Sequence, residues 1–467
     1  MRRRALEHAY RGLERRELIR NGSSAPNRRA RQLCLEALGA ALAAINPSDN
    51  LRSWLKVKRD ELVVGDLSIP LPERIRVIAV GKASVPMIES ALRILGKRVT
   101  AGILVAPKGK AVPKFQRRIK VFRSGHPIPD QVGIRAGKQV LLLANQMQED
   151  EMLLCLISGG ASAMLPAPVD AISLKDKMTI TEQLIRSRAT IHEINTVRRH
   201  LSKLKGGRLA EECKAGLIIS LIVSDVAGNE LHDIASGPTA PDRTTFHDAV
   251  NVLKKFKVWD IAPRNIKQFF LEGVQGKVSE TPKPDSQIFR RVHNFIVAEN
   301  RTACEAANGA LKKMRTDCTI LTSSADMEAR SMGKLLASIA TESQRYGQPL
   351  HGPSAILLGG ETTVEVKGAG IGGRNQEAIL SAVHQITGLR GFAIAALGTD
   401  GIDGTSPAAG AIADGYSLTR ATRRGLDVTS FLARNDSYNF FKRLDDAIVT
   451  GPTGTNVGDL YIVVRAE

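Results

Sequence analysis

Short apolar segments that run directly into glycine turns or acidic residues limit the possible folds of this chain more than any other feature. Three of them cover 74–81 (RIRVIAVG), 152–160 (MLLCLISGG) and 217–225 (LIISLIVSD). Segments with helical periodicity separate them, and near-continuous apolar strands that alternate with helices are typical of parallel sheets covered on both faces. The sequence therefore predicts an α/β protein with a doubly wound pattern.

The chain has 467 residues, too many for one ordinary core, so we expect more than one domain. A polar, proline-containing segment around 275–287 is the best candidate for a linker. We predict two α/β domains, the N-terminal one Rossmann-like with a mostly parallel sheet. The four predicted parts are a flexible basic arm over 1–27, an N-terminal α/β domain over 28–242, a connecting helix and linker over 243–290, and a C-terminal α/β domain over 291–467.

Charge and composition narrow the classes of function. The net charge of +19 suits an enzyme of anionic metabolites, although a generally basic, solvated surface would give the same value. Aromatic residues make up only 4% of the chain and no nucleic-acid-binding motif is present, so we expect no nucleic-acid partner. No apolar run reaches the roughly 18 residues of a membrane helix. The five cysteines are scattered without a CxxC pair, which favours a reducing, cytoplasmic location.

Three strand ends in the N-terminal half carry candidate site residues. Lys82 follows a strand and a glycine, where its ammonium group could bind a carboxylate or phosphate; the alternative is a surface lysine. The segment 156–165 (LISGGASAML) joins a strand to a helix start, and the N–H groups and helix dipole there favour a phosphate over a plain tight turn. Asp225 ends the next strand and could hold Mg²⁺ or orient a hydroxyl. The phosphate-binding residues predicted in the second segment are Ser158, Gly159, Gly160 and Ser162.

The segment after Asp225 contains further polar residues. We interpret Asp233 and Asp242 as turn or capping residues and His232 as a surface residue, because all three lie in a polar loop.

A second group of glycine-rich loops lies in the C-terminal half. GAGIGG over 368–373 matches GxGxxG between a strand and a helix, which is the context of a dinucleotide fingerprint. It comes late in the chain, however, and the next strand-end acid, Asp400, lies further away than the roughly 20 residues expected. Arg374 directly after it suggests a phosphate or carboxylate clamp instead. The glycines predicted to bind phosphate or nucleotide here are Gly359, Gly360, Gly372 and Gly373.

Acidic and amide side chains complete the candidate site. Glu361 follows a double glycine, and Asp400 and Asp403 lie three residues apart in a glycine-rich loop, so Glu361 and Asp400 are candidate Mg²⁺ ligands; a structural turn is the alternative for the second loop. The amide and hydroxyl side chains predicted to line a ligand pocket are Asn435, Thr455 and Asn456. Cationic clamps, N–H-rich loops and strand-end carboxylates are the components of phosphoryl transfer.

In this order the motifs resemble the class II glycerate kinases, the family whose C-terminal portion is called MOFRL. The stretches that carry the resemblance are VGKAS, GHPIPD, LISGGASAML, INTVRRHLSKLKGGRLA, SDVAGNELHDIASGPTAPD, GGETTVEV, GGRNQE, GTDGIDGTSPAAGAIADG and NDSYNFF with TGPTGTNVGDL. The resemblance implies ATP- and Mg²⁺-dependent phosphorylation of D-glycerate, commonly to 2-phosphoglycerate, in a cleft between two α/β domains. It also implies that Lys82 and Arg374 lie in the active site. One departure is Asn229-Glu230, where the family usually has an acidic pair.

The resulting hypothesis assigns roles to these groups. Arg374 or Lys82 holds the glycerate carboxylate, and the loop over 158–162 receives the γ-phosphate. Asp225 orients or deprotonates the attacking hydroxyl, and Asp400 or Glu361 contributes to Mg²⁺ binding.

Two other functions stay open at this point. One is an NAD(P)H-dependent hydroxypyruvate reductase that uses GAGIGG, and the other is a non-catalytic nucleotide or metabolite sensor. A homodimer is the assembly we consider, with D-glycerate and ATP as the small-molecule partners and no membrane partner.

Overall fold

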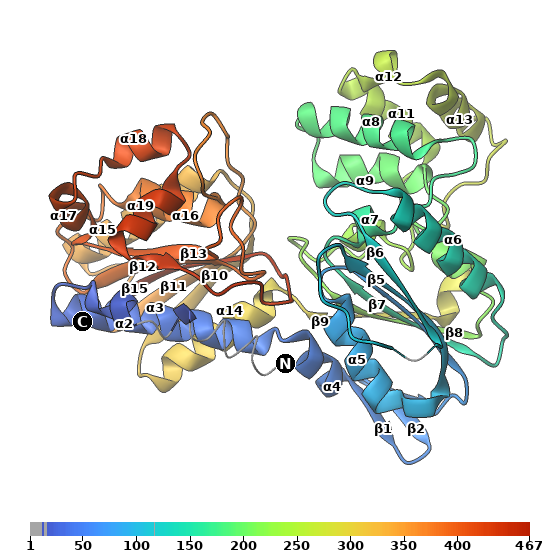
Figure 1. The fold of residues 1–467 in the computed structure, drawn as a ribbon, viewed down its shortest axis with the longest axis horizontal. Helices are drawn as coiled ribbons and strands as arrows, with labels where there is room; N and C mark the ends of the chain where they lie inside the picture. The colour runs from blue at the N-terminus through green and yellow to red at the C-terminus, as the bar shows by residue number, and fades with distance from the viewer. Residues whose placement is uncertain (1–11, 14–15, 116) are drawn as a thin grey trace. The chain divides into compact units, whose positions relative to one another are not determined.

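A computed structural model describes residues 12–13, 16–115 and 117–467 and divides the chain into two compact units (Figure 1). The described residues up to Asn46 join Ala298–Glu467 in the first, which we call the terminal unit. The second, which we call the central unit, is Pro47–Val297. Each unit is built around its own six-stranded sheet.

The sheet of the central unit has the order β6-β5-β4-β7-β8-β9. Counted from its first strand this order is 3-2-1-4-5-6, that of a Rossmann-type doubly wound fold. The pairs β4–β5, β5–β6, β4–β7 and β7–β8 are all parallel, which confirms the predicted parallel sheet. The strands are β4 (Ile75–Val80), β5 (Val99–Pro107), β6 (Ile119–Ser124), β7 (Met152–Ser158), β8 (Leu217–Val223) and β9 (Val292–Ala298).

Capped helices connect these strands. Asp130 accepts a hydrogen bond from the Gly133 amide at the start of α6, Ser173 caps α8 as predicted, and Thr190 forms a capping box at α9. Figure 1 shows α5 and α6 on opposite sides of the strands. The helices are α4 (Pro47–Trp54), α5 (Ser84–Leu95), α6 (Gln131–Asn145), α7 (Ala161–Met164), α8 (Leu174–Arg186), α9 (Ile191–His200), α10 (Arg208–Glu212), α11 (Phe246–Lys255), α12 (Val258–Ile261) and α13 (Arg264–Val274).

The central unit also has a small antiparallel sheet that the sequence patterns did not predict. Its strands are β1 (Leu55–Lys58), β2 (Glu61–Val64) and β3 (Leu67–Pro70). Only one residue of β1 is buried, so its four residues lack the apolar run by which the longer strands are recognised.

The terminal unit has a mixed sheet in the order β10-β11-β15-β12-β13-β14. β15 is antiparallel to both β11 and β12, so these two strands run in the same direction on either side of it. Asp459, the first residue of β15, is opposite Gly360 at the end of β11 and Gly398 at the end of β12. The strands are β10 (Asp317–Ala325), β11 (Ser354–Gly360), β12 (Phe392–Gly398), β13 (Gly410–Asp414), β14 (Ala447–Ile448) and β15 (Asp459–Arg465).

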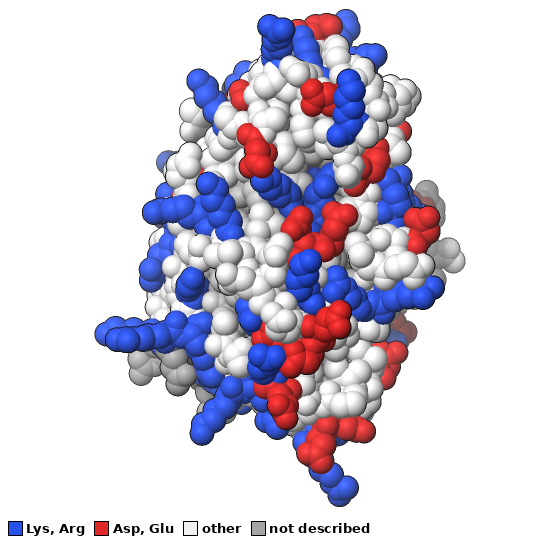
Figure 2. Space-filling model, turned by 90° about the vertical axis from the view of Figure 1, so that its right-hand side faces the viewer, with Lys and Arg blue, Asp and Glu red and all other residues white. Residues whose placement is uncertain are grey.

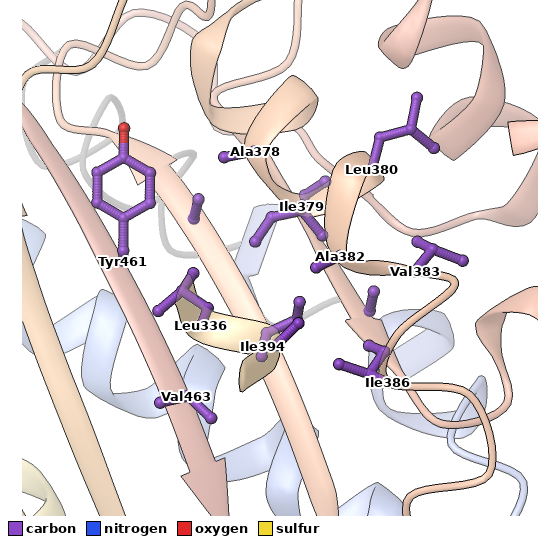
Figure 3. Close-up of a cluster of buried hydrophobic side chains, with 14 of the residues drawn as sticks. Leu336, Ala378, Ile379, Leu380, Ala382, Val383, Ile386, Ile394, Tyr461 and Val463 are labelled. Atoms are coloured by element: carbon purple, nitrogen blue, oxygen red, sulfur yellow. The ribbon is translucent and has the colours of Figure 1, made fainter. Parts of the chain in front are cut away.

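A buried apolar cluster holds the helices of this unit against the sheet. Figure 3 shows residues of α16 such as Ile379 and Ala382 beside Ile394 of β12 and Val463 of β15. The packing fixes α16, whose first residue is Arg374. The helices are α2 (Arg16–Arg20), α3 (Ala25–Ala44), α14 (Asn300–Lys313), α15 (Ala329–Tyr346), α16 (Arg374–Ala382), α17 (Ser417–Arg423), α18 (Val428–Ala433) and α19 (Ser437–Leu444).

The predicted flexible arm over 1–27 differs from the structure in its second half. Residues 1–11 and 14–15 lie outside the described part of the chain, but 16–27 contain α2 and the start of α3. Arg31 of α3 is fully buried and pairs with Asp414 and Asp446. These buried contacts place 28–46 in the terminal unit and not in the predicted N-terminal domain.

Two further boundaries also differ from the prediction. The segment 243–290 is part of the central unit, because α11 and α13 pack with α8 and α9 around Phe246 and Phe270. The strand over 292–298, predicted to begin the C-terminal domain, is the edge strand β9 of the central sheet.

The surface shows no strong separation of charge on the face drawn in Figure 2, where Lys and Arg side chains lie among Asp and Glu side chains. Over the described ranges, no helix has the length and apolar character needed to cross a membrane.

Candidate active site

In the central unit, a group of candidate residues lies where the strand order of the sheet reverses, between β4 and β7. Ligands of doubly wound sheets bind at the carboxyl ends of the strands beside this point. The amide of Lys82 after β4 donates to the carbonyl of Gly159 after β7, at 2.9 Å. The Ser158 hydroxyl accepts from the Ala83 amide at 3.0 Å and donates to the Val80 carbonyl. Ser158 therefore joins the two loops to each other and is not aimed at a ligand.

The glycines of the loop after β7 allow two functional side chains to lie directly against it. A Cβ atom on Gly159 would come within 1.9 Å of a carboxylate oxygen of Asp225. A Cβ on Gly160, whose φ is +83°, would come within 2.8 Å of the His126 ring. The structure thus places the Asp225 carboxylate against the loop that was predicted to bind phosphate. His126 was not among the predicted site residues, although its place in GHPIPD after β6 was a usable signal.

Ser162, the other predicted hydroxyl of this loop, is held by a buried lysine. Lys205 Nζ donates to Ser162 Oγ at 3.1 Å and to the carbonyls of Ser162 and Ala235 at 3.3 Å. The hydroxyls of Ser162 and Ser236 lie 2.8 Å apart. Lys205 is only 3% exposed. Its partners in the described part of the chain are neutral oxygens, so its charge has no local carboxylate.

Lys205 belongs to a group of basic residues with the buried Lys177 and the partly buried Arg198, which we call the basic cluster. Burial lowers the pKa of Lys205 well below its usual range, and the charges of Lys177 and Arg198 lower it further. Burial and Arg198 lower the pKa of Lys177 to about 7, and burial lowers that of Arg198 to about 10. No ion pair of these three residues occurs within the described ranges. An anion bound beside these groups would favour their protonated, charged forms.

Sequence patterns contain no direct sign of the basic cluster, because lysines and arginines on and after helices are normally exposed. Only the tertiary structure brings the three together and places Lys205 beside the loop that contains Ser162.

The turn after Asp233 has an unusual backbone conformation next to the same loop. Ala235 and Ser236 have φ values of 54° and 60°, in the left-handed region, and Gly237 follows with 63°. Such a conformation costs roughly 1–3 kcal/mol for each non-glycine residue. The Ser236 hydroxyl donates to Asn195 Oδ1 at 3.0 Å, and Lys205 bonds the Ala235 carbonyl, so hydrogen bonds hold the turn in place.

Arg374 is the centre of a separate group of candidate residues in the terminal unit. Its Nε and Nη2 donate to the two carboxylate oxygens of Asp459, at 2.5 and 3.1 Å, and its Nη1 donates to Glu361 at 2.5 Å. Burial alone would lower the pKa of Arg374, but the charges of Asp459 and Glu361 outweigh it and raise the pKa. A planar guanidinium held in this bidentate way is charged and fixed in orientation. Asp459 was not predicted, because pairing of β15 with β11 and β12 is long-range information.

The candidate metal ligands lie just beyond the ends of the two strands that flank β15. Glu361 follows β11 and is half exposed, and Asp400 follows β12 with its Oδ1 accepting from the Ile402 amide at 3.1 Å. Asp403 has a different role: its two carboxylate oxygens accept from the amides of Asn375 and Gln376 and so cap α16. Glu361 and Asp400 offer hard oxygen donors, which suit Mg²⁺.

Backbone amides in and just before the GAGIGG loop form hydrogen bonds to other parts of the protein. The amides of Lys367 and Gly368 donate to Asn435 Oδ1, and the Gly370 amide donates to the Arg434 carbonyl at 2.9 Å. A Cβ on Gly368 would lie 2.3 Å from the Arg434 carbonyl oxygen. In a dinucleotide fingerprint these amides would face a pyrophosphate. The loop therefore does not have the arrangement of a dinucleotide site.

The four glycines predicted to bind nucleotide in the terminal unit also have close protein neighbours. A Cβ on any of them would approach a protein atom to between 1.6 and 2.3 Å. These contacts explain glycine at each position by packing, and a nucleotide-binding role for them stays a prediction. The residues are Gly359 beside Asn300, Gly360 beside Ala325, Gly372 beside Ser437 and Gly373 beside Asp403.

The three predicted pocket residues differ in what they can offer a ligand. The Asn435 amide nitrogen donates to Glu377 at 3.0 Å, and its oxygen holds the GAGIGG loop, so Asn435 is a positioning residue. Asn456 accepts from the Gly458 amide at 3.3 Å. Thr455 Oγ1 is buried and has no hydrogen-bond partner among the described residues, which makes it the best placed of the three to contact a ligand.

Comparison of the sequence and the structure with known proteins shows which proteins this chain is similar to. Residues 33–271 match a family model described as a domain of unknown function, DUF4147, and residues 354–459 match the MOFRL family. A glycerate 2-kinase of Pyrococcus horikoshii is 39% identical over 93% of this chain and 97% of its own. A putative hydroxypyruvate reductase of Agrobacterium vitis is 37% identical over 84% of this chain and 89% of its own. The crystal structure of glycerate kinase from Thermotoga maritima superposes with a TM-score of 0.81 at 36% identity, covering 93% of this chain and 99% of that one.

Proposed function

This chain belongs to the family of glycerate kinases that combine DUF4147 and MOFRL regions, and from that membership we propose that it transfers the γ-phosphoryl group of ATP to D-glycerate to give 2-phosphoglycerate. The observation that carries the proposal is a set of groups suited to bind an anion where the strand order of the central sheet reverses. We call this place the switch point. There the Lys82 amide bonds the loop over 158–162, Lys205 bonds Ser162 in the same loop, and the Asp225 carboxylate lies against Gly159.

The loop over 158–162 receives the phosphoryl group in this proposal. It leads into α7, and the first amides of a helix have no partner within the helix. Lys205 of the basic cluster bonds Ser162, and a bound phosphoryl group would favour the protonated, charged form of this lysine, which then stabilises the negative charge of the transferred group. Ser158 and Lys205 act as positioning residues, because their polar atoms are engaged within the protein.

Asp225 is the group that orients or deprotonates the attacking hydroxyl. That oxygen forms a bond to the γ-phosphorus while the bond from phosphorus to the β-γ bridging oxygen breaks, so ADP leaves. The hydroxyl proton passes to the Asp225 carboxylate and then to solvent. The contact of this carboxylate with Gly159 supports the assignment.

Arg374 or Lys82 binds the carboxylate of glycerate. Arg374 supports this role because Asp459 and Glu361 fix its guanidinium while it stays 30% exposed. Lys82 supports it because it follows β4 at the switch point.

Glu361 and Asp400 are the residues that would hold Mg²⁺, since both are strand-end carboxylates on the strands that flank β15. When bound, the ion neutralises charge on the phosphate oxygens of the nucleotide. Arg374 keeps Glu361 oriented through their ion pair.

The reductase alternative has support in the names of some relatives, such as the Agrobacterium vitis protein. Against it, the amides of the GAGIGG loop are occupied by Asn435 and Arg434. A hydride-transfer function would need a cofactor site elsewhere in the chain.

The activity test compares the two reactions directly. We expect ADP release from ATP, Mg²⁺ and D-glycerate, with 2-phosphoglycerate identified by ³¹P NMR, and no NADH or NADPH oxidation with hydroxypyruvate. Oxidation of the nicotinamide without ADP release would overturn the kinase assignment. Formation of 3-phosphoglycerate would overturn only the choice of hydroxyl.

The roles of the two cations are tested by Lys82→Ala and Arg374→Ala. Each should lower kcat/KM by on the order of 10²-fold or more, because each removes charge stabilisation from the reacting groups. Arg301→Ala, at an exposed arginine that pairs with Glu305 on α14, is the matched control and should keep normal kinetics. Normal turnover in both test variants would contradict the proposed arrangement.

A further inference from the structure

Three metal-binding side chains come together in the central unit, apart from the residues assigned to the reaction. His192 lies on α9, and His232 and Asp233 lie in the loop after β8. One donor atom from each residue lies within 4.8 Å of the other two. We propose that His192, His232 and Asp233 form a binding site for a divalent transition-metal ion of the zinc class.

The distances fit such an ion after a small change at one residue. Zinc binds imidazole nitrogen at about 2.0–2.1 Å, which in a tetrahedral site separates neighbouring donor atoms by about 3.3 Å. His232 Nε2 is 3.5 Å from Asp233 Oδ2, close to that separation. His192 Nδ1 contacts the same oxygen more closely and must move outward. Its side chain is 58% exposed, which leaves room for that movement.

Hydrogen bonds already aim the carboxylate at the two histidines. Asp233 is buried, and its Oδ1 accepts from Asn195 Nδ2 at 3.1 Å and from Arg199 Nη1 at 3.2 Å. The other oxygen, Oδ2, is the one that faces both rings. A ligand oxygen fixed in this way loses little conformational freedom when the ion binds.

His232 has the second contact that is typical of a metal-binding histidine. Its Nε2 faces Asp233, while its Nδ1 faces a carboxylate oxygen of Glu230 at 3.6 Å. At this distance the carboxylate forms no hydrogen bond, but a small movement would let it accept the Nδ1 hydrogen and make the ligating nitrogen more basic. Two imidazoles and one carboxylate select zinc-class ions over Mg²⁺, which prefers oxygen ligands.

The site is linked to the turn with left-handed residues. Asp233 directly precedes the short helix η2 (Ile234–Ser236), and Asn195 bonds both Asp233 and the Ser236 hydroxyl. An ion that binds the folded site but not the unfolded chain stabilises the fold increasingly as its concentration rises. We therefore expect the ion to raise the melting temperature of the protein.

The test uses the full chain, without a histidine tag and freed of metal with a chelator, in buffer without nucleotide. Co²⁺ should bind with one-to-one stoichiometry and give the visible absorption of a four-coordinate site, and Zn²⁺ should displace it in calorimetry. The double variant His192→Ala/His232→Ala should bind Zn²⁺ at least about 100-fold more weakly, because two of three ligands are lost. His247→Ala, at an exposed histidine on α11, is the matched control and should bind like the wild type.

Three results would overturn the site: no Co²⁺ binding to the wild type, equal Zn²⁺ affinity in the double variant, or an equal loss in His247→Ala. Circular dichroism of the double variant checks its folding. If that variant does not fold, His192→Gln replaces it, since His192 is exposed and its loss removes one ligand only. An unchanged Zn²⁺ affinity in His192→Gln would also overturn the site. The outcome does not depend on the kinase activity, because binding is measured without substrates.

Discussion

At the scale of single residues, the basic cluster places three basic side chains in the central unit without an ion pair among the described residues. Lys177 donates a hydrogen bond to the Leu201 carbonyl at 3.3 Å and is 6% exposed. An apolar residue of similar size in place of such a buried basic group is often stabilising.

Lys177→Met should therefore make the protein more stable at neutral pH and less able to bind glycerate. The pKa of Lys177 is lowered to about 7, whereas the unfolded lysine titrates near 10.5. Between these pH values the unfolded chain holds a proton that the folded chain lacks, so wild-type stability falls as pH drops from about 10.5 to 7. The substitution removes that loss, and we expect a gain on the order of 1–3 kcal/mol at neutral pH that shrinks as the solution becomes alkaline.

Denaturant unfolding at several pH values measures the change in the free energy of unfolding, and steady-state kinetics measure the KM for glycerate. Lys175→Met, on the exposed face of the same helix, is the control and should change neither quantity. A Lys177→Met protein that is less stable than the wild type at neutral pH would show that the lysine is favourably paired.

At the scale of elements, the segment around 275–287 connects no domains and instead ties α9 to α11. Glu280 accepts from the Phe246 amide at 2.8 Å and contacts His200 and Lys283 at 3.2 and 3.1 Å. Burial alone would raise the pKa of Glu280, but these three partners outweigh it and hold the pKa at about 2. The unfolded glutamate titrates near 4.5.

Glu280→Gln should lower stability at neutral pH, and the difference from the wild type should disappear in acid. Because the folded pKa lies below the unfolded one, the contribution of Glu280 is fully present above pH 4.5 and is lost as pH falls towards 2. Melting temperatures of the wild type and the variant, measured from neutral to acid pH, show this difference in stability. Glu149→Gln, at an exposed position, is the control. A constant difference across that range would contradict the assigned pKa.

Local sequence patterns were enough to predict the elements that carry most of the candidate site. β4, β7 and β8 appear where the apolar runs predicted them, with Lys82, Ser158 and Asp225 at or just beyond their ends. What the patterns could not provide was the position of distant segments. The burial of Lys205 and the pairing of Asp459 with Arg374 depend on contacts between residues far apart in the chain.

The same limit explains the wrong domain limits. The Arg-rich start of α3 resembles a solvated segment, yet Arg31 is buried because Asp414 and Asp446 come from strands and loops hundreds of residues away. Charge composition alone predicts exposure, and only the paired acids reverse that expectation.

At the scale of the whole molecule, the two units differ in how they use the chain. The central unit is one continuous segment with its own sheet and cores, whereas the terminal unit needs two separated segments. A continuous unit with its own core is expected to fold independently.

A fragment of residues 47–297 should therefore fold cooperatively on its own. Thermal unfolding of this fragment followed by circular dichroism should show a single transition. A fragment of 298–467 alone should not show a cooperative transition, because it lacks α3, which packs on its sheet. A chimera that joins 16–46 to 298–467 by a flexible linker is the matched comparison and should recover folding. Failure of the 47–297 fragment to unfold cooperatively would contradict the division into units.

The position of β15 has a consequence for how the protein is made. β11 and β12 leave the ribosome before β15, yet neither pairs with the other, and β15 alone joins them. Until β15 emerges, the sheet of the terminal unit can form only as two separate halves, and Arg374 lacks its main partner Asp459. The central unit can fold during translation as a finished piece. Chaperones that meet the nascent chain would therefore encounter the exposed halves of the terminal sheet, and slow synthesis just before β15 would prolong that exposure.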